Sequence, residues 1–255
     1  MDWARQINIK TPAEIAIMRA AGRINALTLA AIRELLQPGV TTADLNAAAE
    51  EVLRKHGAYS AFKGYGQPPF PASITVSISE QLVHGIPGKR KLKVGDIVSV
   101  DCGAVVEGYV GDSAFTAGVG EISRQAQKLL DVTEKALYVG IETMRAGNRT
   151  GDVSAAIQHF VEGHGFHVVR EYTGHGVGQK MHEGPQVPNY GTPGTGILLQ
   201  PGMTIALEPM VIVGTHRTRV LSDRWTVISA DRSLSAHFEH TVAITEGGPF
   251  ILTLP

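Results

Sequence analysis

The sequence predicts an α+β protein in which helices cover a central antiparallel sheet and two similar halves are related by a pseudo-two-fold axis. Three observations support this fold class. Capping signals followed by apolar residues three or four apart indicate helices. Short apolar runs ending in a carboxylate indicate strands, and both patterns recur about 107 positions further along the chain. We therefore expect one domain over residues 1–255, with halves at about 10–120 and 121–250.

Composition sets limits on the class of protein. The 255 residues are 43% hydrophobic and 18% charged, an ordinary globular balance. The net charge is -1, and the absence of a long Lys/Arg run argues against specific nucleic acid or an anionic membrane as partner. The N-terminus has no apolar region typical of a secretory signal, and no stretch of about 18 apolar residues predicts a membrane span. Cys102 is the only cysteine, so it cannot form an internal disulfide. We expect a soluble, cytoplasmic protein.

Two helices are predicted near the N-terminus. Thr11 offers a capping hydroxyl, Pro12 suits the first helical position, and Glu14 completes a capping box. The apolar face of this first helix is expected at Ile15, Met18, Ile24, Leu27, Ala31 and Leu35. Pro38–Gly39 ends it, and a second helix is expected from about Thr42 to His56.

The internal repeat is the strongest topological signal. Gly39–Gly57 aligns with Gly147–Gly165, and seven of the 19 positions are identical. Val94–Asp101 and Pro201–Glu208 each contain a glycine, a short apolar strand and a terminal carboxylate. Chance similarity between such segments is the alternative. If the repeat is real, Asp101 and Glu208 occupy equivalent positions, and a site built from both lies between the halves.

A predicted hairpin brings two further carboxylates together. A turn centred between Val106 and Glu107 would place Asp101 opposite Asp112. Like charges on opposed strand positions are destabilising, so a shared proton, a basic side chain or a cation is needed. The alternative is that one aspartate caps a turn.

Other acidic residues and a histidine favour the cation. Glu208 ends an apolar strand, and Glu239 interrupts the strand pattern of Ala236–Ile244. Several carboxylates in apolar strands suggest more than one metal ion; a solvated edge strand is the alternative for Glu239. The glycine-rich segment Thr173–Gly178 is expected to be a loop carrying His175. Such a donor set favours Mn(II), Fe(II) or Co(II) over a structural zinc.

The remaining histidines carry weaker signals. His84 lies in a predicted rigid turn, and His182 follows His175 by seven residues. Loop histidines are more often surface residues. His237 and His240 flank Glu239, and the pattern assigns them no role.

Together these segments resemble the type I methionine aminopeptidases from about residue 10 to residue 253. In this order the motifs are highly specific, although each alone is only moderately so. They are Val83–Pro87 (VHGIP), Gly95–Asp101 (GDIVSVD), Gly111–Asp112, Gly174–Gly178 (GHGVG), His182–Gln186 (HEGPQ), Gly202–Pro209 (GMTIALEP) and Phe238–Thr241 (FEHT). The resemblance implies the pita-bread (creatinase/aminopeptidase) fold, which has two related halves.

The resemblance also implies removal of the N-terminal methionine by a water that bridges two divalent ions (Co, Mn, Fe or Zn). It assigns the five ligands: Asp101 to one ion, His175 and Glu208 to the other, and Asp112 and Glu239 as bridges. Glu208 would also take and return the proton of the water. The resemblance puts His182 near the scissile carbonyl and His84 near the scissile nitrogen.

The same resemblance implies a methionine pocket lined by Phe70, Met181 and Trp225. Met181 is more often Phe in bacterial members, Phe70 more often Tyr, and Thr75 stands where many have Cys. These substitutions keep the pocket apolar but change its shape. The resemblance implies the family's usual preference for a small second residue of the substrate. Nascent polypeptide N-termini are the implied partners. We expect a monomer, and any transient ribosome contact would use the core domain, since this chain lacks the N-terminal Cys-rich extension of some members.

Three other functions share some of these sequence features. A proline-directed peptidase resembles the ligand motifs but usually carries a longer N-terminal domain. A non-catalytic binding protein on this fold should have lost ligands, whereas all five are present. A metal-dependent phosphoesterase would need a basic phosphate pocket, which is not evident near these motifs.

Overall fold

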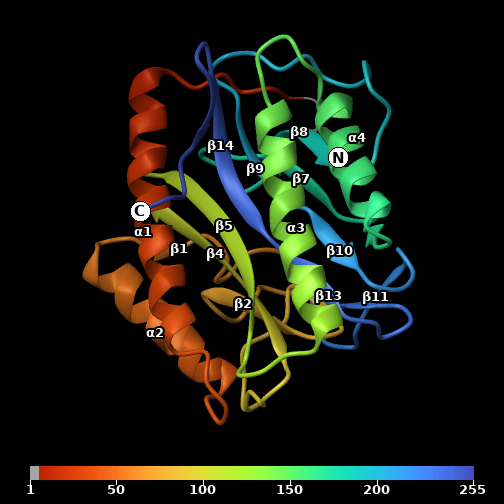
Figure 1. The fold of residues 1–255 in the computed structure, drawn as a ribbon. Helices are drawn as coiled ribbons and strands as arrows, with labels where there is room; N and C mark the ends of the chain where they lie inside the picture. The colour runs from red at the N-terminus through yellow and green to blue at the C-terminus, as the bar shows by residue number, and fades with distance from the viewer. Residues whose placement is uncertain (1–5) are drawn as a thin grey trace.

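Two helix pairs flank an antiparallel sheet in the computed structural model, which describes residues 6–255 (Figure 1). The helices are α1 (Pro12–Glu34), α2 (Thr42–Lys55), α3 (Arg124–Thr143) and α4 (Thr150–Gly163). In the first half the strands are β1 (Tyr59–Ser60), β2 (Ile74–Ile78), β3 (Gln81–Val83), β4 (Ile97–Val106) and β5 (Tyr109–Gly118). In the second half they are β6 (His167–Val168), β7 (Thr173–Gly176), β8 (Glu183–Pro188), β9 (Thr204–Leu207), β10 (Met210–Ile212), β11 (Thr218–Val220), β12 (Val227–Ser229), β13 (Ser235–His237), β14 (Glu239–Thr245) and β15 (Gly248–Ile251).

The main sheet joins the two halves. Its nine strands follow the order β1-β4-β5-β14-β9-β7-β8, with β2 beside β4 and β15 beside β14. All of these pairs are antiparallel, and β5 of the first half meets β14 of the second. In Figure 1, α1 and α2 lie on one side of the view and α3 and α4 on the other, with β5 and β14 between them. The predicted α+β class with a central antiparallel sheet is confirmed.

Hydrogen bonds repeat the pseudo-symmetry residue by residue. Isolated bridges join Thr41 to Lys91 in the first half and Arg149 to Leu198 in the second. The amide of Gly39 donates to the carbonyl of Leu92, and that of Gly147 donates to the carbonyl of Leu199. Because equivalent backbone groups make equivalent bonds, the repeat found in the sequence is a repeat of structure.

Helix α1 begins as predicted, but its buried face differs. Thr11 and Glu14 form the capping box. Leu27 is 44% exposed and Leu35 39%, whereas the small Gly22 and the polar Asn25 face the sheet. The reason is close approach, since a Cβ on Gly111 of β5 would lie 2.5 Å from the amide nitrogen of Gly22.

Asn25 ties α1 to the hairpin of β4 and β5. Its amide nitrogen donates to the carbonyls of Cys102 and Gly111, and its oxygen accepts from the hydroxyl of Ser113. These bonds satisfy a fully buried amide beside two acidic positions of the hairpin. Cys102 itself is fully buried among apolar side chains.

By length and composition α1 could also cross a membrane, with 23 residues and a mean hydropathy of 1.4. It lies near the N-terminus, and 44% of its apolar window is buried. Because β4 and β5 cover that buried part, its apolar character is accounted for by the fold.

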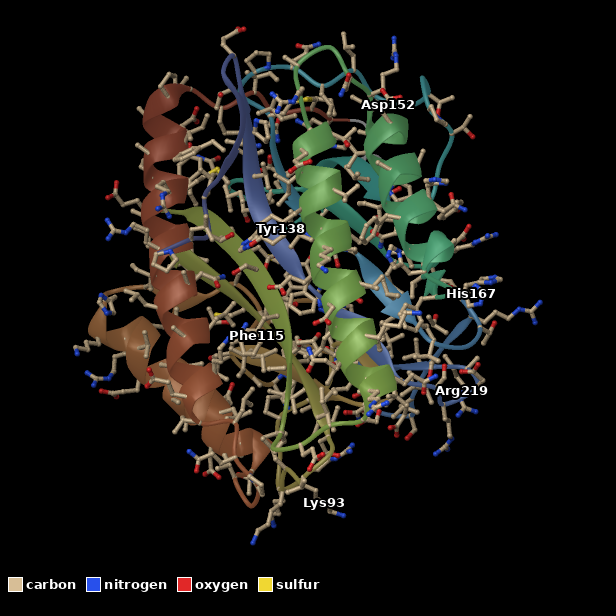
Figure 2. All side chains as sticks on the ribbon, in the orientation of Figure 1. Lys93, Phe115, Tyr138, Asp152, His167 and Arg219 are labelled. Carbon is tan, nitrogen blue, oxygen red and sulfur yellow. The ribbon has the colours of Figure 1, made fainter. Side chains whose placement is uncertain are left out.

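The main core lies between the helices and the sheet. Phe115 of β5 lies between α1 and α3, and the guanidinium of Arg33 stands 4.1 Å from its ring centroid (Figure 2). Charged side chains such as Lys93 and Arg219 project from the periphery in the same view.

Candidate metal centre and substrate cavity

The hairpin of β4 and β5 supplies two carboxylates, but its register differs from the prediction. Asp101 pairs with Ala114 and Asp112 with Gly103, so the two aspartates are not directly opposite. The turn is formed by Glu107 and Gly108, both with positive φ, which moves the centre of the hairpin by one residue. The aspartates still share one face, in diagonal positions that leave a gap between them.

A small residue provides space for the cluster. Ala114 pairs with Asp101 on one side and with Glu239, the first residue of β14, on the other. Neighbouring strands lie about 4.8 Å apart, so a larger side chain at Ala114 would fill the space between the two carboxylates. Thr241 fixes this join, because its hydroxyl donates to the carbonyl of Asp112 and accepts from its amide.

The second half contributes His175 and Glu208. His175 lies on strand β7, so the predicted loop is in part a strand, and it pairs with Ala206 of β9. Glu208 directly follows β9. The Nδ1–H of His175 donates to the carbonyl of Gly176 at 2.9 Å. This bond leaves the lone pair of Nε2 free to bind a metal.

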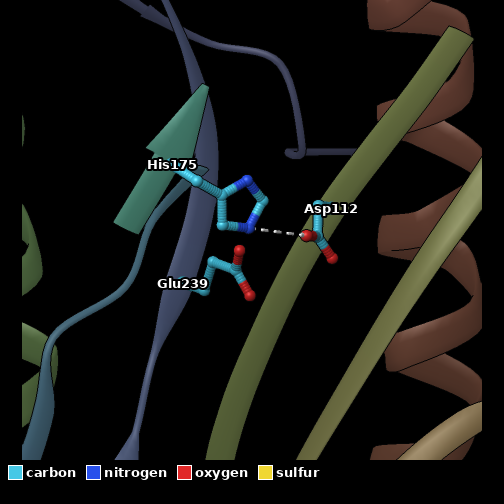
Figure 3. Close-up of side chains that lie close together, drawn as sticks. All are labelled: Asp112, His175 and Glu239. Carbon is cyan, nitrogen blue, oxygen red and sulfur yellow. Dashed lines mark ion pairs between the residues drawn. The ribbon is translucent and has the colours of Figure 1, made fainter. Parts of the chain in front are cut away.

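These side chains converge on one point between the halves. His175 Nε2 lies 3.8 Å from Asp112 Oδ2 and 3.6 Å from Glu208 Oε1. Figure 3 shows His175, Asp112 and Glu239 pointing toward one another from three strands, and their ligand atoms lie within 4.8 Å of one another. Two donors that each lie about 2.1 Å from the same ion are separated by about 3–4 Å. The observed spacing therefore fits donors that share an ion.

Burial makes the cluster electrostatically expensive without a cation. Burial raises the pKa of four carboxyls well above their usual range, those of Asp101, Asp112, Glu208 and Glu239. Repulsion from neighbouring acids raises the pKa further at three of them, Asp101, Asp112 and Glu239. Burial also lowers the pKa of His175 to about 3, with His182 adding to the effect. The imidazole is therefore neutral, the form that binds metals.

The donor set fits a divalent cation. Within residues 6–255, the buried oxygens Asp101 Oδ1, Asp112 Oδ1 and Glu239 Oε1 have no hydrogen-bond partner. No Lys or Arg in that part of the chain forms an ion pair with any of the four carboxylates. Oxygen donors with one imidazole suit hard or intermediate divalent ions. A cation would compensate both the charge and the unpaired oxygens.

A cavity of about 110 Å³ opens onto these donors. Every residue predicted for the site lines it. They are Asp101, Asp112, His175, Glu208 and Glu239 as predicted ligands, with Phe70, Thr75, His84, Met181, His182 and Trp225. The walls next to the ligands are largely apolar, and the Phe70 and Trp225 rings meet edge to face at 5.2 Å.

Two histidines face the cavity beside the ligands. The ring of His182 lies 4.2 Å from that of His175, and its Nδ1 is 2.6 Å from the hydroxyl of Tyr65. His84 has a positive φ of 59, as a tight turn requires, and its ring contacts Trp225 edge-on. Burial lowers the pKa of both, that of His84 to about 4.

Sequence reasoning missed three residues of this region. Phe62 and Tyr65 line the cavity, and nothing in their surroundings in the sequence indicated it. His237 has its Nε2 within 4 Å of both Glu208 and Glu239. A signal existed for His237, because residues 237 and 239 fall two apart in a strand pattern and so on the same face.

Comparisons with known proteins agree with this geometry. Residues 16–246 match the model of metallopeptidase family M24. The chain is 53% identical to methionine aminopeptidase of Clostridium acetobutylicum over 249 residues, covering 97% of this chain and 99% of that protein. It is also 53% identical to methionine aminopeptidase 1 of Bacillus subtilis over 244 residues, covering 96% and 98%.

Solved structures distinguish two degrees of similarity. The crystal structure of methionine aminopeptidase from Thermotoga maritima matches with a TM-score of 0.96 at 47% identity, over 98% of this chain and all of that one. An Xaa-Pro dipeptidase from Bacillus anthracis matches with a TM-score of 0.78 at 25% identity, over 96% of this chain but 61% of that one. The predicted pita-bread fold is confirmed. The chain belongs to metallopeptidase family M24 and, within it, to the methionine aminopeptidases.

Proposed function

We propose that this protein removes the N-terminal methionine from polypeptides and prefers a small second residue. The proposal rests on one observation: the cavity that the carboxylates and His175 line is also lined by the apolar side chains of Phe62, Phe70, Met181 and Trp225. An unbranched, polarizable methionine side chain suits such a wall. The relatives with the same function in their names support the proposal over nearly the whole chain.

Asp101, Asp112, His175, Glu208 and Glu239 would hold two divalent ions, of Co, Mn, Fe or Zn. When bound, such ions ionise water near neutral pH and polarise the scissile carbonyl. Glu208 is the proposed proton carrier, because it stands beside His175 with a carboxyl whose proton affinity burial increases. It would accept a proton from the attacking water and return it to the departing amine.

His182 and His84 are the proposed substrate contacts. Tyr65 can donate to Nδ1 of His182, which leaves Nε2–H to donate to the oxygen of the scissile carbonyl. His84 stands against Trp225 at the cavity wall and would orient the scissile nitrogen. Both side chains are half-buried, and burial lowers the pKa of each ring, which favours the neutral form that donates one hydrogen bond without a charge.

The cellular setting follows from the proposed substrate. Newly made polypeptide N-termini would be the partners, with a transient ribosome contact through the catalytic domain. We also propose a single domain over residues 1–255, a cytoplasmic location and a monomeric state, with Thr75 as part of the substrate wall.

A pair of tripeptides tests the proposal. We expect Met-Gly-Ser to be cleaved and Gly-Pro-Met to be left intact, across Mn(II), Co(II), Fe(II) and Zn(II), because the cavity wall is apolar. A proline-directed aminopeptidase would instead cleave the bond before proline in Gly-Pro-Met and leave Met-Gly-Ser intact. Equal cleavage of both peptides would reject the proposal.

A ligand substitution tests the metal requirement. His175→Ala should lower metal content, measured by elemental analysis, and activity together, because it removes the nitrogen donor that faces Asp112 and Glu208. Full activity of the wild-type protein in metal-stripped buffer would contradict the proposal.

A further inference from the structure

His237 is a buried histidine behind the acidic cluster. It ends β13 and is only 2% exposed. Its Nε2 lies 3.5 Å from Glu208 Oε2 and 3.8 Å from Glu239 Oε2. In the described part of the chain this nitrogen has no hydrogen-bond partner. Burying a polar atom without a hydrogen-bond partner is unfavourable, so its position calls for a physical reason.

The backbone holds this imidazole in one place. Thr116 of β5 donates from its hydroxyl to the carbonyl of His237 and accepts from its amide. The Thr116 hydroxyl also lies 2.8 Å from that of Ser99 on β4, and His237 pairs with Met210 of β10. The backbone of His237 is therefore anchored to strands of both halves, and its side chain starts from a fixed position beside the carboxylates.

His237 is not among the residues that line the substrate cavity. It approaches Glu208 from the side opposite to His175, since Oε1 of Glu208 faces His175 and Oε2 faces His237. Its nearest polar atoms at the site are carboxylate oxygens of Glu208 and Glu239. A neutral imidazole has one N–H and one lone pair, so His237 can donate a hydrogen bond from Nε2 toward the carboxylate oxygens near it.

We propose that His237 is a positioning residue: when a metal ion holds Glu208, a small closure of the 3.5 Å separation lets Nε2–H of His237 donate to Oε2, which fixes the direction in which this carboxylate presents Oε1 to the ion. The inference deepens the proposed function and rests on it. Oε2 of Glu239, at 3.8 Å from the same Nε2, is a more distant acceptor than Oε2 of Glu208 at 3.5 Å. Partners of this kind typically contribute about 10–100-fold to metal affinity.

Two substitutions separate positioning from mere packing. His237→Ala removes the donor, whereas His237→Gln places a neutral amide N–H at nearly the same reach. His240→Ala is the matched control, because His240 lies on the neighbouring strand with its Nδ1 on the hydroxyl of Thr253, away from the cluster. If His237→Ala does not fold, as judged by circular dichroism, His237→Leu replaces it, since leucine fills similar volume without a donor.

Metal binding and kinetics are measured separately. Metal-stripped proteins are titrated with Mn(II) by calorimetry, and kcat and KM are measured with Met-Gly-Ser. For His237→Ala we expect Mn(II) affinity to fall about 10–100-fold and kcat, at saturating metal, to fall more than KM changes. His237→Gln should recover most of both losses, and His240→Ala should match the wild type.

Three results would overturn the inference. The first is unchanged Mn(II) affinity and kcat in His237→Ala. The second is a His237→Gln protein as damaged as His237→Ala. The third is a change in the coordination number of bound Co(II), seen in its visible absorption, on removal of His237, because that would make the histidine a direct ligand. Failure of the proposed function alone is distinguishable, since wild-type protein would then bind Mn(II) tightly without cleaving Met-Gly-Ser.

Discussion

Removing the metal should make the stability of this protein fall as pH rises. Burial raises the pKa of Asp101, Asp112, Glu208 and Glu239 in the folded state. Above the unfolded pKa of about 4, the folded protein therefore holds more protons than the unfolded chain. The free energy of unfolding then decreases with pH, and the stabilisation present below about pH 4 is lost as pH rises through the raised folded values.

The size of the effect follows from the number of groups. All four carboxyls have a raised pKa in the folded state, so their contributions to the pH dependence have the same sign and add together. Metal reverses the trend, because it binds the ionised ligands and is favoured at higher pH. At 100 times its dissociation constant a metal adds about 2.7 kcal/mol, or about 5–11 °C in Tm.

The assay is thermal unfolding of chelated and Mn(II)-loaded protein between about pH 5 and pH 8. We expect the gap in Tm to widen with pH. In the double variant Asp101→Asn with Asp112→Asn both the slope and the gap should shrink, whereas Glu246→Gln, at an exposed acid, should behave as wild type. A metal-free protein whose stability rises over this range would refute the reasoning.

Two further predictions follow from single contacts. Tyr65→Phe removes the hydroxyl that lies 2.6 Å from Nδ1 of His182. We expect kcat for Met-Gly-Ser to fall about tenfold, which corresponds to the loss of one hydrogen bond. Tyr59→Phe, at an exposed position, is the control and should have no effect. An unchanged kcat would remove Tyr65 from the proposed mechanism. Gly111→Ala should destabilise the protein by about 1–3 kcal/mol in urea unfolding, because the new Cβ meets the backbone of α1. Gly163→Ala, where a Cβ meets nothing within 4 Å, is its control, and equal effects of both would contradict the packing argument.

Much of the architecture could be predicted because its signals are local or periodic. The capping box of Thr11 and Glu14 depends on residues three apart, and it forms as expected. The repeat of Gly39–Gly57 in Gly147–Gly165 required only comparison of the chain with itself, and it appears in the structure as α2 and α4. Local hydrogen bonding and side-chain periodicity are written directly in the order of residues.

Other features depended on distances that no local pattern records. The hairpin centre was wrong by one residue, since it depended on which two residues could adopt positive φ, and these are Glu107 and Gly108. The buried face of α1 was partly wrong because the close approach of Gly111 favours Gly22 over larger apolar residues. Both outcomes are decided by packing between elements far apart in sequence.

The sequence by itself determined the repeat, the helix starts, the acidic strand ends and the family resemblance, because each lies in short segments of defined composition. Only the tertiary structure decided that Ala114 lies between Asp101 and Glu239 in the sheet. It also decided that Tyr65 contacts His182 and that His237 contacts Glu208. These relations join different strands and loops. Their physical cause is the register and packing of the sheet across the two halves, which brings side chains together irrespective of their separation along the chain.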